Sequence, residues 1–170
     1  PRRTQDAGEL VAASILVDLA VNERVHLYDG HLRADSQMPL NHPLLTEAME
    51  LLTGKNATVA EGIDLIARNM APLPPKILDT LFRRDLMHRI EFRDWRLRKR
   101  LRYPLRSMQA RNEAMQLLQS AAHADDTHRL ALLVLADVTG ILAAQLNAHD
   151  HAPAVQKILA LNHVEAWAPQ

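Results

Sequence analysis

The sequence predicts a mainly α fold, a single globular helical domain with two short β-hairpins at about residues 24–33 and 88–99. Apolar residues recur at helical spacing over most of the chain, β-branched and aromatic residues are few, and two short alternating segments surround turn-forming residues. The 170 residues suit one domain, 1–170, and the 48% of hydrophobic residues excludes wholesale disorder.

Helical periodicity predicts seven helices along the chain. We expect them over residues 7–21, 43–52, 58–70, 75–87, 105–122, 129–146 and 153–161. The sixth is the most apolar, so we expect it to form the buried centre. Pro75 and Pro153 suit the first turn of the helices that they begin, because the missing N–H of proline has no helical partner there.

Side chains that cap helices predict where three of these helices begin. Asp6 precedes the first helix, and a side-chain oxygen at that position accepts from the free N–H groups of the first turn. Thr58 with Glu61 three residues later is a capping-box pattern. Asp125 or Asp126 is expected to cap the most apolar helix.

The two hairpins are predicted from alternation around a turn. The first has Asp29-Gly30 at its centre, the strongest short-range hairpin signal in a sequence. The second is expected to turn at Arg93-Asp94. Alternation then places Trp95, Leu97 and Lys99 on one face of the returning strand and Arg96 and Arg98 on the other.

The formal net charge of zero hides a strongly basic segment. Between Lys76 and Arg106 there are eleven cations and four acids, a net charge of +7, so the rest of the chain carries −7. Guanidinium groups form bidentate hydrogen bonds with phosphate, and an indole ring favours a headgroup boundary. The residues predicted from this pattern to bind anionic lipid headgroups are Trp95, Arg96, Arg98, Lys99, Arg100, Arg102 and Arg106. The alternative is a solvated hairpin whose charges pair with acids elsewhere.

Motifs for catalysis and for cofactors are absent, so the sequence predicts no enzyme and no cofactor. The chain has no cysteine, no Walker pattern, no dinucleotide glycine fingerprint and no nucleophile elbow. His149-Asp150-His151 is the tightest histidine cluster; we expect these to be exposed loop histidines and predict no metal site, although chelation stays open. No apolar run is long enough to span a bilayer. A chain that starts at Pro1 is expected to have lost its native N-terminal segment.

Three segments in order resemble the Golgi phosphoprotein 3 family, including its actinobacterial members. They are ASILVDLAVNERVHL over 13–27, ILDTLFRRDLM over 77–87 followed by RYPL over 102–105, and RLALLVLADVTGIL over 129–142. Asp85 stands where the family usually has Gly. The preference for Arg over Lys, with abundant Ala and Leu, also hints at a GC-rich bacterial genome.

The absence of cysteine fits a reducing cytoplasm, so we expect a cytoplasmic location. The resemblance implies a mainly helical domain that docks peripherally on membranes by binding phosphatidylinositol 4-phosphate. It also implies recognition of the cytosolic tails of membrane proteins, and self-association through the hairpin. The family's lipid-binding positions fall at Arg3, Ala12, Ala71 and Pro74, of which only Arg3 is a cation. Lys76 lies near the second pair, so Arg3 and Lys76 join the predicted lipid-binding residues.

Two further interpretations stay open. A helix over 75–87 followed by a basic hairpin over 88–99 also reads as half of a winged-helix unit, which would bind nucleic acid. In an interaction scaffold, Trp95 and Leu97 would be buried between two subunits, with arginines at the rim.

Overall fold

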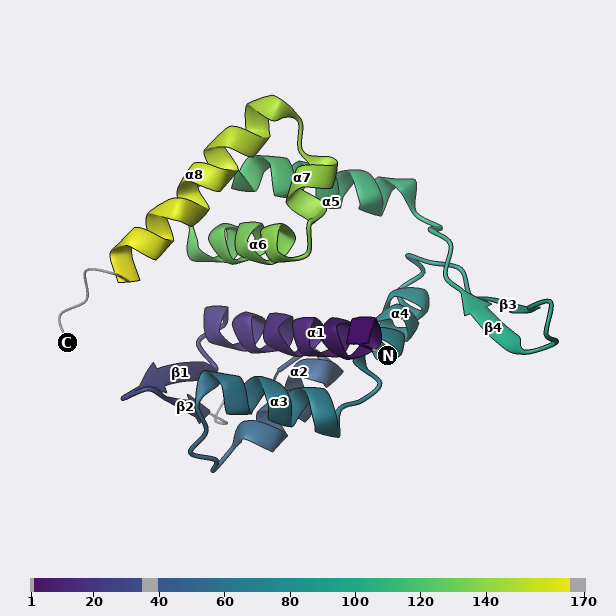
Figure 1. Ribbon diagram of the computed structural model, residues 1–170, viewed down its shortest axis with the longest axis horizontal. Coiled ribbons are helices and arrows are strands. Elements are labelled where there is room, and N and C mark those ends of the chain that lie inside the picture. Colours follow the sequence, from purple (N-terminus) through teal and green to yellow (C-terminus); the bar gives the residue numbers. More distant parts are fainter. Residues whose placement is uncertain (1, 35–39, 166–170) are drawn as a thin grey trace. The chain divides into compact units, whose positions relative to one another are not determined.

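The structure, a computed structural model, describes the backbone of residues 2–34 and 40–165, and the side chains of residues 7–34 and 40–160. The chain divides into two units, residues 1–107 and 108–170 (Figure 1). Eight helices and two antiparallel two-stranded sheets are present in the described part of the chain, which confirms the mainly α prediction. That the whole chain is one domain stays a prediction.

The first unit is built around its N-terminal helix. It contains α1 (Arg2–Val21), β1 (Val25–Tyr28), β2 (His31–Ala34), α2 (Pro43–Leu52), α3 (Val59–Asn69), α4 (Leu73–Arg83), β3 (Ile90–Arg93) and β4 (Lys99–Arg102). Helix α1 contacts α2, α3 and α4. The core of this unit comprises Ala12, Ile15, Leu16, Leu19, Val25, Leu32, Leu44, Leu45, Ala48, Met49, Leu52, Ile66, Met70 and Leu73.

Helix α1 begins earlier than expected and ends with a left-handed residue. It already includes Arg2, so the prediction that Asp6 caps it is wrong; residues 2–5 contain no Pro or Gly that would stop the helix. At its end Glu23 has a φ of 57°. The N–H of Arg24 then donates to the carbonyl of Leu19 at 2.8 Å, as in the Schellman motif.

Local turn and cap signals in the first unit are confirmed. Asp29 and Gly30 have φ angles of 49° and 73°, as a type I′ turn requires, and the strands pair up to the turn. The hydroxyl of Thr58 accepts from the N–H of Glu61 at 3.3 Å, and the N–H of Thr58 donates to Glu61 Oε2 at 2.8 Å. These bonds are the predicted capping box.

Helix α4 covers 73–83 rather than 75–87, because Asp85 ends it. Asp85 has a φ of 59°. Its N–H donates to the carbonyl of Phe82 at 2.9 Å, and that of Leu86 donates to Leu81 at 3.0 Å. Asp85 thus occupies the left-handed position at a helix end that usually takes Gly.

The second hairpin exists but turns later than expected. Strands β3 and β4 pair over 90–93 and 99–102, so the prediction of a turn at Arg93-Asp94 is wrong. Residues 95–98, expected in a strand, form the turn. A two-residue hairpin turn needs positive φ at the first or at both of its central positions, and this segment has no Gly to supply it.

The second unit is helical throughout its described part. It contains α5 (Met108–Ala121), α6 (Thr127–Val138), α7 (Ile141–Gln145) and α8 (Ala148–Glu165). Its buried cluster comprises Leu118, Ala121, Ala122, Leu133, Ala136, Leu142, Leu146 and Ala154. Asp126 caps α6, since its Oδ1 accepts from the N–H of Arg129 at 2.9 Å.

The boundaries of three helices in this region differ from the expectation. The helix expected over 129–146 is broken by Gly140, whose φ is 72°, so α6 and α7 are separate. Helix α5 begins after Leu105, which still pairs with Met87 of the hairpin. Helix α8 begins ahead of Pro153, so the histidines expected in a loop lie in its first turn.

The most apolar segment, 129–146, is central to the second unit. It supplies Leu133, Ala136, Leu142 and Leu146, half of the buried cluster of that unit. That this segment is the buried centre of the whole chain stays a prediction.

Candidate functional site

The basic hairpin, residues 87–105, ends in a turn that is organised by one carboxylate. Asp94 Oδ1 accepts from the N–H of Arg96 and from the N–H of Arg98, each at 2.9 Å. The carbonyl of Asp94 accepts from the N–H of Leu97 at 2.9 Å. The bonds to its carboxylate hold the pKa of Asp94 below its ordinary value; the bond from the Arg98 N–H contributes most. Asp94 therefore stabilises the turn through its carboxylate.

Two large apolar side chains stand at the end of this turn and form its apolar tip. Trp95 is 84% exposed and Leu97 is 75% exposed. The guanidinium carbon of Arg96 lies 4.3 Å from the centre of the Trp95 ring, within cation–π range. The tip thus combines an exposed apolar surface with adjacent positive charge.

The register of the hairpin divides its cations between two faces. Directly paired residues share a face, and Ile90 pairs with Arg102 whereas Arg93 pairs with Lys99. One face carries Ile90, Phe92, Arg100 and Arg102, and the other carries Glu91, Arg93, Lys99 and Leu101. Arg102 lies over the Phe92 ring at 4.5 Å. Trp95, Leu97 and Lys99 therefore do not line one strand face, contrary to expectation.

Four of the predicted lipid-binding cations contact acids; three of them lie in or beside the hairpin. Lys99 Nζ lies 3.0 Å from Glu91 Oε1, Arg100 Nε lies 3.3 Å from Asp94 Oδ2, and Arg106 pairs with Asp85. The three cationic side chains are more than half exposed. Exposed ion pairs contribute only about 0–1 kcal/mol, so these cations can exchange a carboxylate for a phosphate at little cost.

The structure brings only part of the predicted site together. Trp95, Arg96, Arg98, Lys99 and Arg100 lie at or beside the turn, Arg102 lies farther along β4, and Arg106 lies at the base of the hairpin. Lys76 is on α4, where its Nζ donates to Glu47 Oε1 at 2.8 Å. Arg3 is in α1, and its side chain lies outside the described residues. Leu97 was missing from the predicted lipid-binding residues. The signal available in the sequence was the absence of Gly, which disfavours a tight turn and so leaves Leu97 in a longer turn rather than in a strand.

The positions that the family resemblance assigns to lipid binding offer little to a phosphate. Ala12 is fully buried in the core of the first unit. Ala71 and Pro74 line a cavity of about 370 Å³ together with Glu9, Asp64 and Arg68. The charged residues of this lining are two acids and one arginine, so a phosphate would meet a net negative charge there.

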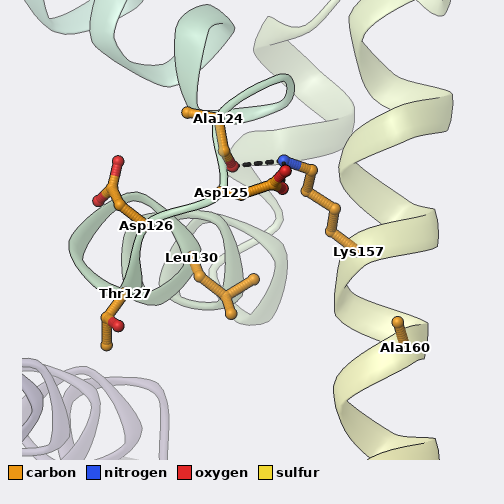
Figure 2. A pocket seen from close by; sticks show the side chains of 7 residues that line it. All are labelled: Ala124, Asp125, Asp126, Thr127, Leu130, Lys157 and Ala160. Carbon is orange, nitrogen blue, oxygen red and sulfur yellow. Dashed lines mark hydrogen bonds and ion pairs between the residues drawn. The ribbon is translucent and has the colours of Figure 1, made fainter.

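A cavity of about 350 Å³ in the second unit is shown in Figure 2. Lys157 of α8 reaches the loop before α6, where its Nζ bonds to the carbonyl of Ala124 and lies 2.7 Å from Asp125 Oδ1. That lysine holds the pKa of Asp125 below its ordinary value. The lysine is thus engaged in joining two segments, and the carboxylate of Asp126 contacts Arg129 at the start of α6.

Comparison with known proteins gives one result. The family model described as Golgi phosphoprotein 3 (GPP34) matches residues 1–170. No curated protein matches the chain. Within the described residues no helix has both the length and the apolar character that crossing a membrane requires.

Proposed function

Because the chain belongs to the Golgi phosphoprotein 3 (GPP34) family, we propose that it is a non-enzymatic, peripheral membrane module that docks on anionic phospholipid. The docking element is the end of the basic hairpin, with Trp95 and Leu97 entering the headgroup boundary and the flanking cations contacting phosphates. The observation that carries this proposal is the exposure of both apolar side chains between arginines. A bacterial origin stays a prediction.

The backbone of the tip supports a functional role for Leu97. Its φ of 58° places a bulky residue in the left-handed region, which costs about 1–2 kcal/mol and which Gly or Asn would adopt more easily. The side chain gains no burial there. A strained residue that exposes an apolar group is better explained by a contact made outside the chain than by folding.

Docking by the end of the hairpin accommodates the division of its cations between two faces. Residues 87–105 include seven Lys and Arg and two acids, a net charge of +5. Each cation near an anionic surface contributes about 1 kcal/mol, and the effect decays within about 8–10 Å. In an end-on approach, the cations of both faces nearest the turn come within this range together.

The headgroup is proposed to be recognised by charge rather than by its shape. A stereospecific pocket needs fixed donors around the phosphate, whereas Ala71 and Pro74 line a cavity whose charged residues are two acids and one arginine. Phosphatidylinositol 4-phosphate and a bacterial anionic lipid are therefore both suitable ligands. We expect vesicles of equal surface charge to bind equally, whichever of these lipids supplies the charge.

Vesicle sedimentation tests this proposal directly. The protein is expected to sediment with anionic vesicles at low salt, to be released as salt rises, and to stay in solution with neutral vesicles. Arg98→Glu changes the charge at the tip by two units, which is about 2 kcal/mol or roughly thirtyfold in partitioning. The matched control is Arg33→Glu, an identical charge change on the β1–β2 hairpin. Equal losses in both variants, or no preference for anionic vesicles, would refute the proposal.

Two further measurements separate the other interpretations. Duplex DNA binding with a steep salt dependence, without vesicle binding, would favour a nucleic-acid module. A dimeric mass in solution that Trp95→Ala reduces to a monomer would favour self-association through the tip. Recognition of the tails of membrane proteins stays a prediction.

A further inference from the structure

The second unit brings His123 close to His149 and to Asp150, which lies 27 residues later in the chain. His123 follows α5, whereas His149 and Asp150 lie in the first turn of α8. His123 Nε2 and His149 Nδ1 lie 3.0 Å and 3.1 Å from the same atom, Asp150 Oδ1. One ligand atom from each of the three residues lies within 4.8 Å of the others.

The carboxylate of this cluster is fixed in position by the start of α8. Asn147 Nδ2 donates to Asp150 Oδ2 at 2.9 Å, and the N–H of Asp150 donates to Asn147 Oδ1 at 2.9 Å. Oδ2 is therefore occupied, and Oδ1 faces the imidazoles. The Asp150 side chain is only 13% exposed, whereas the His123 and His149 rings are open to solvent. An ion can thus reach a carboxylate that is already oriented.

The spacing suits a transition metal ion. Zinc binds imidazole nitrogen and carboxylate oxygen at about 2.0–2.2 Å in a tetrahedron, which puts two ligand atoms about 3.4 Å apart. Both nitrogen–oxygen distances are within half an ångström of that value, and the two nitrogens, which lie within 4.8 Å of each other, would approach further as the exposed rings turn toward an ion. We propose that His123, His149 and Asp150 form a binding site for a zinc-type divalent ion, with the remaining position open to water. Two imidazoles favour zinc over calcium or magnesium, which take oxygen ligands.

A hydrogen-bonded trio without metal is the competing explanation, because Asp150 Oδ1 can accept an N–H from each ring. In that case the cluster only joins the end of α5 to the start of α8, and zinc has no preferred place on it. The hydrogen bond from Asn147 to the carboxylate is compatible with both explanations, because carboxylates that ligate a metal are also hydrogen-bonded. The site lies in the second unit, so it does not depend on the hairpin proposal.

Metal titration of the full chain tests the assignment. We expect one zinc ion to bind per chain by calorimetry, cobalt to give the visible absorption of a four-coordinate site, and zinc to raise the thermal midpoint. His149→Ala should lower zinc affinity by about tenfold or more, since even residues behind the ligands change affinity by that amount. His123→Ala should do the same.

The matched control is His151→Ala, which removes a histidine from the same turn without touching the three ligands. This variant should bind zinc like the wild type. His149 is a surface side chain, so His149→Ala keeps the test valid if His123→Ala fails to fold. Equal zinc affinity in wild type and His149→Ala would overturn the site, as would an equal loss in His151→Ala.

Discussion

Removal of the indole at the tip is the most informative perturbation of the proposed docking surface. A Trp side chain has about 200 Å² of surface, of which the 84% exposed fraction of Trp95 leaves roughly 170 Å² in water. If half of this area leaves water on docking, about 25 cal/mol per Å² gives about 2 kcal/mol. Trp95→Ala should therefore weaken partitioning onto anionic vesicles by about thirtyfold.

The assay is a vesicle titration at fixed salt, with Tyr28→Ala as the matched control. Tyr28 is a 65% exposed aromatic residue on the β1–β2 hairpin, and the guanidinium carbon of Arg33 lies 4.9 Å from its ring centre. The control thus removes an aromatic–arginine pair of the same kind elsewhere on the first unit. Tyr28→Ala should partition like the wild type, and Trp95→Ala should unfold at the same temperature. Equal partitioning of Trp95→Ala and wild type would refute the reasoning.

Three further predictions concern the framework. Leu19→Ala, at a fully buried core position, should lower the free energy of unfolding by about 2–5 kcal/mol in urea denaturation; a change below 1 kcal/mol would contradict the assigned core. Glu23→Gly should raise the free energy of unfolding by about 0.5–1 kcal/mol, because relief of the left-handed strain exceeds the entropy cost of glycine; a loss would contradict the Schellman end. The pKa of Asp94 lies below its ordinary value of 3.8, so its contribution to the free energy of unfolding is complete above that pH and is lost as pH falls through the lowered pKa. The amide NMR shifts of Arg96 and Arg98 should change over the same pH range. Amide shifts that do not change there would show that the carboxylate does not hold the turn.

Local signals in the sequence predicted much of the fold. Thr58 with Glu61 and Asp29 with Gly30 act through bonds between near neighbours, so their geometry follows from residue type. Asp126 caps α6 for the same reason. The break at Gly140 was also visible in the sequence, yet the apolar periodicity on both sides of it favoured one continuous helix.

The rest depends on contacts that periodicity does not encode. Asp85 ends α4 in the left-handed region although it has a Cβ. A helix end without Gly cannot be located from the residue types alone. The turn of the basic hairpin is set by Asp94 and two backbone N–H groups, which moved the tip to residues that were expected in a strand. The pairing of His123 with Asp150 joins distant segments and is seen only in three dimensions.

The central claim is that the indole of Trp95 enters the headgroup boundary of an anionic membrane. The chain contains two tryptophans, so Trp167→Phe leaves Trp95 as the sole indole fluorophore. With brominated anionic vesicles, we predict a blue shift of its emission and quenching by the bromine atoms, both reversed by high salt. Emission that stays unshifted and unquenched while the protein sediments with the same vesicles would contradict the claim.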